Sequence, residues 1–442
     1  MKNNQEISTQ EQLDDLSAFR QLVYQNGLEQ ASDAQFELID AILTSDNIRC
    51  FAELSLSPLH RRTWSSAYAA IEKGQQERDY LRRLFIHHLP NERVQVFALD
   101  ASKWIHADAR TLSGLVLGPT TSKRNIQPVH VYSMLAYIPE REGSWAVPIS
   151  TERLHPEDTE VQLGIRQVQQ LCDCSPRDPL RVIVADGSYG NHLFLKGLKE
   201  LPCAAVVRLR RDRVLYGEAV YGGKGRPPVH GKRFAFKEPD TWTVPNEDVT
   251  FEHALHGQVR VRSWKQLHAK QDSTVPFTAI RCEIHLERDK PPDPLWIAYD
   301  GPSHVTVCTI WEWYNARQTI EPAFRFRKQH LFWTRPQFQD SERCDRWTLL
   351  VDIAYWTVWL ARHLVQDCPL PWQKSLATLT PGRILRGMAS LFTQIGTPAC
   401  DPQTRGNSSG WTKGRQRTRP KPYSVVKRGK KAPAAQLKSL MP

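Results

Sequence analysis

The sequence lacks the closely spaced cysteine pairs from which most zinc-binding modules are built. Its 442 residues include nine cysteines, and the two that lie closest together form the CDC stretch at 172–174. Because no pair of CxxC motifs is present, the cysteine pattern does not indicate a zinc site. Reduced thiols in a cytosol are the expected state.

A long uninterrupted apolar run is also missing. The most apolar stretch, residues 347–365, contains Asp352 and Arg362, and one Asp at the centre of a membrane helix costs about 2.5–3.5 kcal/mol. We therefore expect a core helix there and no membrane partner. The first residues, MKNNQEISTQEQ, are polar and lack the apolar centre of a signal peptide, so a cytoplasmic location is expected.

Acidic residues are absent from residues 402–442, which hold eleven lysines and arginines. Since the net charge of the whole chain is +12, the remainder carries only about +1. Gly, Ser and Pro accompany these cations, a composition that predicts a disordered tail able to contact a polyanion such as DNA; a tail that only improves solubility is the alternative. The strongest candidate DNA contacts are Arg415, Arg417, Arg419, Lys430 and Lys431.

The pattern of apolar residues divides the chain into five regions. Residues 1–95 have helical periodicity and are expected to form a DNA-docking region. From residue 96 the order of expected elements is three strands, helix, strand, helix, strand, which is the order of a ribonuclease-H-like sheet. We predict the following regions: helical 1–95, the first part of an α/β ribonuclease-H-like domain at 96–210, a β-rich insertion at 211–300, the second part of the domain at 301–370 with a short strand at 303–309, and a basic C-terminal region at 371–442.

Three carboxylates follow elements of this expected sheet. Asp100 and Asp186 come at or near the ends of predicted strands, where open α/β sheets present their sites, and Glu321 comes from a later helix. Oxygen ligands of this kind suit Mg²⁺ or Mn²⁺, and two such ions can promote phosphodiester cleavage. Each Asp by itself could be a cap or turn residue, and Asp108 or Asp300 could replace or support Asp100.

The stretch YNARQTIEPAFRFRK, which begins at Tyr314, gathers charges of both signs. On an ideal helix Tyr314, Arg317, Glu321 and Lys328 lie within a narrow arc. A carboxylate among cations indicates a surface shared with a metal-bound phosphate, although a solvated charged stripe gives the same pattern. Pro322 disfavours helical geometry at the residue before it, so the arc is expected to fail beyond a kink while Glu321 stays at a helix boundary.

The spacing of these four residues matches the Tyr-Arg-Glu-Lys signature of the DDE insertion-sequence transposases. The stretches LDAS at 99–102 and ADGSYG at 185–190 are also similar to that family, and the resemblance covers roughly residues 95–365. It implies a cut-and-paste transposase that is associated with the nucleoid of a prokaryote and that synapses two transposon ends as a dimer.

The resemblance also implies roles for individual residues. Asp100, Asp186 and Glu321 would hold two Mg²⁺ or Mn²⁺ ions. The DNA near the cleaved phosphate would be held by a second set, made of Tyr314, Arg317, Arg325 and Lys328. In some members a flipped base stacks on a tryptophan of the insertion, for which Trp296 and Trp242 are candidates. A transposase-derived repressor without catalysis and a standalone DNA nuclease are the alternative functions.

Overall fold

The computed structural model describes most of the chain before the basic tail. The described residues are 8–109, 111–119, 125–140, 143–174, 179–223, 225–285 and 293–403, together with 414 and 422. The predicted DNA contacts of the tail, from Arg415 to Lys431, therefore lie outside the described residues.

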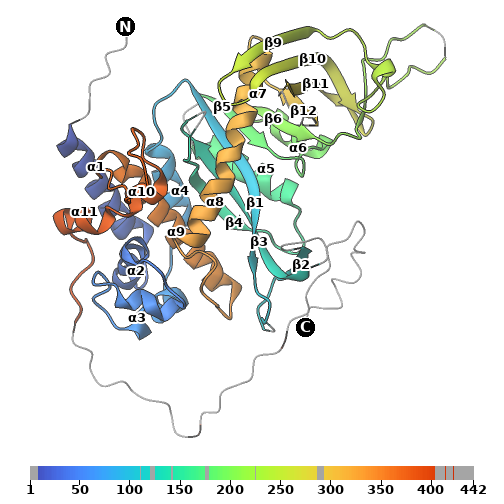
Figure 1. Ribbon diagram of the computed structural model, residues 1–442. Coiled ribbons are helices and arrows are strands. Elements are labelled where there is room, and N and C mark those ends of the chain that lie inside the picture. Colours follow the sequence, from blue (N-terminus) through green and yellow to red (C-terminus); the bar gives the residue numbers. More distant parts are fainter. Residues whose placement is uncertain are drawn as a thin grey trace.

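Helices form the N-terminal region, as the periodicity predicts (Figure 1). They are α1 (Thr9–Leu22), α2 (Ser32–Thr44), α3 (Trp64–Lys73) and α4 (Arg78–His87). The capping box of Ser8 and Glu11 begins α1. Helices α1, α2 and α3 pack against α9 (Ser341–Leu360), so the two ends of the described chain share one helical layer. The boundary at residue 95 stays a prediction.

Twelve strands of the described residues form one mixed sheet, in the order β2-β3-β1-β5-β6-β12-β11-β10-β7-β8 with β4 beside β3 and β9 beside β10. Strand β3 runs antiparallel to β1, whereas β1, β5 and β6 are parallel. With α5 (Glu160–Cys174) before β5 and α6 (His192–Lys199) before β6, the order agrees with the prediction except for the short strand β2, which makes four strands before α5 where three were predicted. The strands of this part are β1 (Val94–Ile105), β2 (Val116–Pro119), β3 (Ile126–Ile138), β4 (Val147–Arg153), β5 (Leu180–Ala185) and β6 (Cys203–Leu209).

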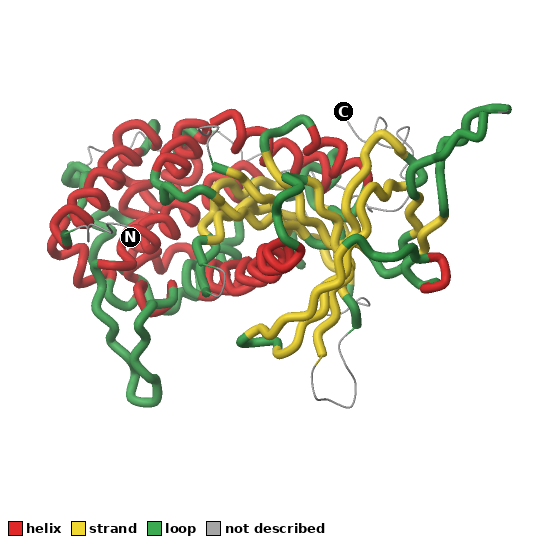
Figure 2. The backbone as a smooth tube through the Cα atoms, turned by 90° about the horizontal axis from the view of Figure 1, so that it is seen from above, coloured by secondary structure: helices red, strands yellow, loops and turns green. Residues whose placement is uncertain are grey.

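The β-rich insertion continues the same sheet. Strand β12 pairs antiparallel with β6, and β11 and β10 follow, so the strands extend from the centre of the molecule away from the N-terminal helices (Figure 2). The strands of the insertion are β7 (Val214–Tyr216), β8 (Arg233–Ala235), β9 (Glu247–His253), β10 (Gly257–Ala269), β11 (Asp272–His285) and β12 (Leu295–Asp300).

The predicted short strand at 303–309 is wrong. Helix α7 (Val307–Ala316) begins inside this stretch, because the side chain of Thr306 accepts a hydrogen bond from the backbone N–H of Thr309 and caps the helix. Of the apolar residues in this stretch, Val305 precedes α7 and Val307 is buried in its first turn. Helices α10 (Pro381–Leu385) and α11 (Met388–Ile395) complete the C-terminal part of the described chain.

The apolar stretch near residue 350 is a core helix, as predicted. Helix α9 is buried along most of its length, and its Asp352 forms an ion pair of 2.5 Å with the fully buried Arg327 of α8 (Ile320–Gln329). Thr151 donates a further hydrogen bond to Asp352. Within the described residues, no helix is long and apolar enough to cross a bilayer.

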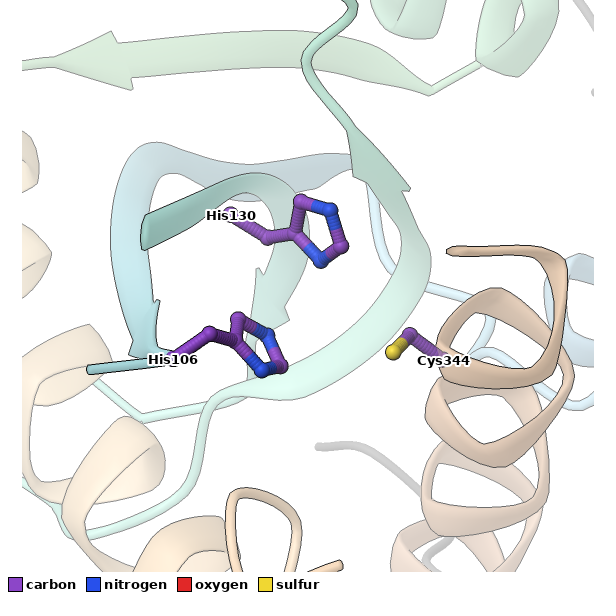
Figure 3. A group of neighbouring side chains, drawn as sticks. All are labelled: His106, His130 and Cys344. Atoms are coloured by element: carbon purple, nitrogen blue, oxygen red, sulfur yellow. The ribbon is translucent and has the colours of Figure 1, made fainter. Parts of the chain in front are cut away.

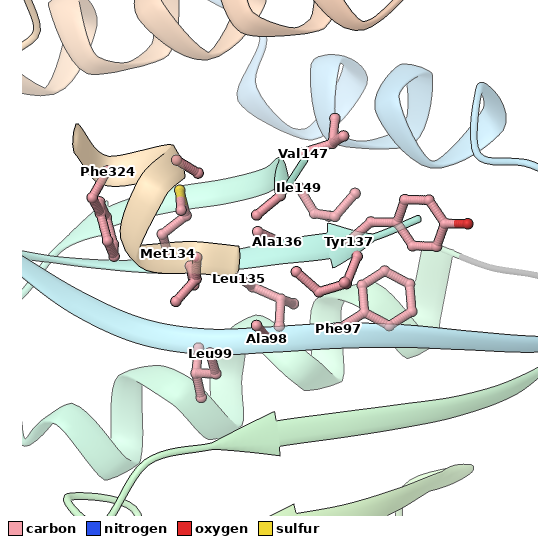
Figure 4. Packing of buried hydrophobic residues seen from close by; sticks show 14 of the residues in the cluster. Phe97, Ala98, Leu99, Met134, Leu135, Ala136, Tyr137, Val147, Ile149 and Phe324 are labelled. Carbon is pink, nitrogen blue, oxygen red and sulfur yellow. The ribbon is translucent and has the colours of Figure 1, made fainter. Parts of the chain in front are cut away.

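Helices cover both faces of the first part of the sheet. Figure 4 shows Met134 on the α8 side of strands β1 and β3 and Leu99 on the opposite side. On that opposite side α5 approaches so closely that a Cβ on Gly164 would lie 2.6 Å from Leu99 Cδ2. Because side chains alternate along a strand, Asp100 faces the side where α7 and α8 lie.

Candidate active site

The register of two parallel strands places Asp100 beside Asp186. The last paired residues of β1 and β5 are Leu99 and Ala185, and the two aspartates are the next residues on each chain. Neighbouring strands lie about 4.8 Å apart, and paired positions in a parallel sheet share a face. The two carboxylates therefore emerge side by side from the centre of the sheet.

Asp100 does not end its strand, which corrects the sequence-based expectation. Strand β1 continues to Ile105, paired with β3, after its pairing with β5 has stopped. The sheet therefore opens between β1 and β5 at this level, and the opening places Asp100 at a site although its own strand continues. Asp186 does follow the last residue of β5, as expected.

Glu321 comes from a broken helix. Helix α7 ends at Ala316, a 3₁₀ turn covers Arg317–Thr319, and α8 begins at Ile320. Pro322 is tolerated because it falls in the first turn of α8, where backbone N–H groups have no partner within the helix. The break confirms the expected helix boundary at Glu321.

Arg317 connects the carboxylates of the sheet and the helix. Its guanidinium donates to Asp100 Oδ2 at 3.1 Å and lies 3.8 Å from Glu321 Oε1. It also lies over the ring of Tyr314, 5.9 Å from the centroid. Tyr314 is itself buried, and this burial raises the pKa of its phenol. Four members of the predicted site, on β1, α7, the 3₁₀ turn and α8, are thus in one group with Asp186 next to it.

The ionised form of Asp100 is disfavoured in this site. Burial raises the pKa of Asp100 to about 6, and the charges of Asp186 and Glu321 act in the same direction, whereas Arg317 lowers it. Only 20% of the Asp100 side chain is exposed. Closely grouped carboxylates of which one resists ionisation are typical of a site that binds a cation.

Two of the predicted DNA contacts lie outside this group. Lys328 is packed over Trp333, 5.9 Å from the ring centroid, and burial together with nearby Arg327 and Lys103 lowers its pKa. Arg325 is exposed and lines an open groove together with Glu321. The single helical arc is therefore wrong for Lys328, because the 3₁₀ turn changes the rotation between α7 and α8.

The two candidate tryptophans belong to the aromatic core of the insertion. Trp296 is 2% exposed and stacks on Phe236, with 3.8 Å between ring centroids. The indole N–H of Trp242 donates to the carbonyl of Ala235 at 2.8 Å, and Arg281 lies over its ring. A base cannot reach Trp296 in this conformation, and base stacking on either residue stays a prediction.

The alternative aspartates are not beside Asp186. Asp300 pairs with Ala205, which is level with Ile183 of β5, so it lies two strands away from Asp186 and three residues lower along the sheet. Asp108 is exposed and follows β1 after His106. Neither carboxylate can replace Asp100 in this arrangement.

One residue that sequence reasoning missed holds Asp186 in place. The backbone N–H and the hydroxyl of Ser188 donate to Asp186 Oδ1 at 2.8 and 2.6 Å. This is the turn that an Asp-x-Ser sequence favours, so the signal was present in ADGSYG. The turn fixes the carboxylate at the opening between β1 and β5.

The donor set fits divalent ions of the Mg²⁺ class. Asp100, Asp186 and Glu321 offer only carboxylate oxygens, which these ions prefer. In the structure the positive charge beside them is supplied by Arg317.

Comparison with known proteins finds a family and a solved structure that are similar to this chain. No curated protein matches the chain. A solved structure, the cryo-EM structure of a piggyBac transposase synaptic complex with hairpin DNA, is similar with 10% sequence identity over 92% of this chain and 81% of the other, at a TM-score of 0.41. Residues 23–271, more than half of the chain and including Asp100 and Asp186, match the model of a family described as DDE superfamily endonuclease. The chain therefore belongs to the DDE superfamily endonucleases.

Proposed function

We propose that this protein is a metal-dependent DNA transposase that binds the ends of an insertion sequence, cleaves phosphodiester bonds and joins the ends to target DNA. The observation that carries the proposal is the register of β1 and β5, which sets Asp100 beside Asp186, with Glu321 linked to Asp100 through Arg317. Membership of an endonuclease superfamily supports the cleavage step.

In this proposal Asp100, Asp186 and Glu321 hold two Mg²⁺ or Mn²⁺ ions through carboxylate oxygens. When bound, the ions would activate a water or a 3′-hydroxyl and stabilise the leaving oxygen of an in-line displacement. Arg317 neutralises Asp100 in the free protein. Once a bound cation neutralises Asp100 instead, the Arg317 guanidinium is available to donate two parallel hydrogen bonds to phosphate oxygens.

The remaining assignments extend the DNA surface around this centre. Tyr314 supports the Arg317 guanidinium from one side, and Arg325 places a positive charge on the groove beside Glu321. Lys328 is assigned to DNA more distant from the carboxylates. The basic tail would add contacts to the phosphate backbone, and two copies would synapse the two ends on the chromosome of a prokaryotic cell.

The test uses purified protein and DNA that carries the sequences flanking its gene. We expect Mg²⁺-dependent nicking and strand joining by the wild type, and loss of both by Asp186→Asn and Glu321→Gln with end binding retained. Asp300→Asn is the matched control, since it makes the same change two strands away from Asp186 and should leave cleavage intact.

Each other outcome identifies a different function. Cleavage without joining identifies a standalone nuclease, and end binding without cleavage by the folded wild type identifies a repressor. Full Mg²⁺-dependent cleavage by Asp186→Asn would remove the carboxylate assignment.

A further inference from the structure

A second cluster of side chains that can bind a metal lies buried near the end of β1, the strand that carries Asp100. His106 directly follows β1, His130 belongs to β3, and Cys344 belongs to the first turn of α9. One ligand atom from each of the three lies within 4.8 Å of the others. Figure 3 shows the two imidazoles and the thiol directed toward one another. All three residues are buried, with 1%, 0% and 0% of their surface exposed.

The hydrogen bonds of His130 leave one nitrogen available to a metal. Its Nε2 lies 2.9 Å from the carbonyl oxygen of Ser113. A carbonyl can only accept, so Nε2 carries the proton and Nδ1 carries a lone pair. This Nδ1 is buried without a hydrogen-bond partner. Metal-ligating histidines commonly donate their other N–H to a backbone carbonyl in this way.

His106 is also without a hydrogen-bond partner. Both of its ring nitrogens are buried and unpaired, and its ring is stacked on Trp104 and in edge contact with His130 at 4.8 Å. Buried polar atoms are rarely left unpaired, because their desolvation is then uncompensated.

We propose that His106, His130 and Cys344 form a structural Zn²⁺ site. Two imidazoles and one thiolate are donors that Zn²⁺ prefers, whereas Mg²⁺ prefers oxygen. Zinc bonds of 2.0–2.3 Å set donor separations of about 3.3–3.6 Å in a tetrahedron, so donors that are 4.8 Å apart need to close by about 1.2–1.5 Å. The three side chains supply three of the four positions of the tetrahedron. Binding releases the thiol proton of Cys344, which leaves a zinc–thiolate bond and one free proton.

The site would join β1, which carries Asp100, to β3 and α9. His106 directly follows the end of β1 that pairs with β3, and His130 lies on β3 at that end. Cys344 belongs to α9, which packs against β4 and the N-terminal helices. Zinc would thus fasten the far end of the β1–β3 pair to α9. Its role is structural, because the cluster is buried and does not include the carboxylates of the active site.

The first experiment measures metal content in the full-length protein as purified without chelator. We expect about one zinc per chain, loss of that zinc in Cys344→Ser and in His106→Gln, and retention in Cys282→Ser, which makes the same change at another buried cysteine. Asp100→Ala, which alters the carboxylate site, should also retain it. Equal zinc in Cys344→Ser and Cys282→Ser would overturn the proposal.

A second measurement does not depend on the folding of any variant. Wild-type protein is stripped by a chelator and titrated with Co²⁺, which should produce a thiolate-to-cobalt charge-transfer band and the ligand-field bands of a tetrahedral site. Zinc should displace the cobalt and raise the thermal unfolding midpoint by several degrees. A protein that holds no zinc and shows no thiolate–cobalt band refutes the site.

Discussion

Replacement of Asp100 by Asn should stabilise the metal-free protein while it abolishes cleavage. The reason is the cost of an ionised carboxylate that is 80% covered and lies near two other acids. Asn has the shape of a protonated Asp and carries no charge. The ion pair with Arg317 offsets only part of the cost, since the pKa of Asp100 remains raised to about 6.

The magnitude follows from the two pKa values. With 3.8 for the unfolded chain and about 6 for the folded protein, the folded state binds the proton more tightly. The free-energy cost of the ionised Asp100 carboxylate to folding is therefore absent below about pH 3.8, grows between pH 3.8 and about pH 6, and is constant above about pH 6. At about 1.4 kcal/mol per unit, it reaches about 3 kcal/mol at pH 7.5 and about half of that at pH 5.

Urea denaturation of wild type and Asp100→Asn in EDTA at pH 7.5 and pH 5 measures this difference. Asp108→Asn is the control, because that side chain is exposed and its loss should change stability by under about 0.5 kcal/mol. Added Mg²⁺ should stabilise the wild type more than the variant and so reduce the difference between their free energies of unfolding. If Asp100→Asn is no more stable than wild type at pH 7.5, or its advantage is the same at pH 5, the argument from burial is refuted.

Three further predictions address the DNA contacts and the core. Glu321→Gln should abolish cleavage with DNA still bound, whereas Lys328→Ala should weaken binding or displace the cleavage position; mapped wild-type cleavage by both folded variants would contradict their assignments. If the tail neutralises about five phosphates, its removal after residue 402 should make the slope of log affinity against log salt shallower by about 4–5, and an unchanged slope would mean that the tail does not touch DNA. Asp352→Ala should lower the free energy of unfolding by about 3–5 kcal/mol, measured by denaturation, because it leaves the buried charge of Arg327 unpaired; a loss below about 1 kcal/mol would show that water reaches that arginine.

Several elements could be predicted because their signals are local. The apolar residues of β3, the apolar run of β5 and the periodicity of α5 each depend on residues close together in the chain. The error at 303–309 has the same origin: a short apolar run suits a strand or a helix, and the capping bond from Thr309 to Thr306 decided for the helix. Lys328 was misplaced because an ideal helix cannot represent the turn at Arg317–Thr319.

By itself, the sequence predicted three candidate carboxylates and most of the order of the elements that carry them, and it showed the concentration of positive charge in the tail. These properties depend on residue type and local spacing. Only the tertiary structure decided that Arg317 pairs with Asp100, that Trp296 is enclosed by aromatic neighbours, and that His106, His130 and Cys344 meet. Strand register and helix docking bring these side chains together from distant positions, and no local pattern contains that information.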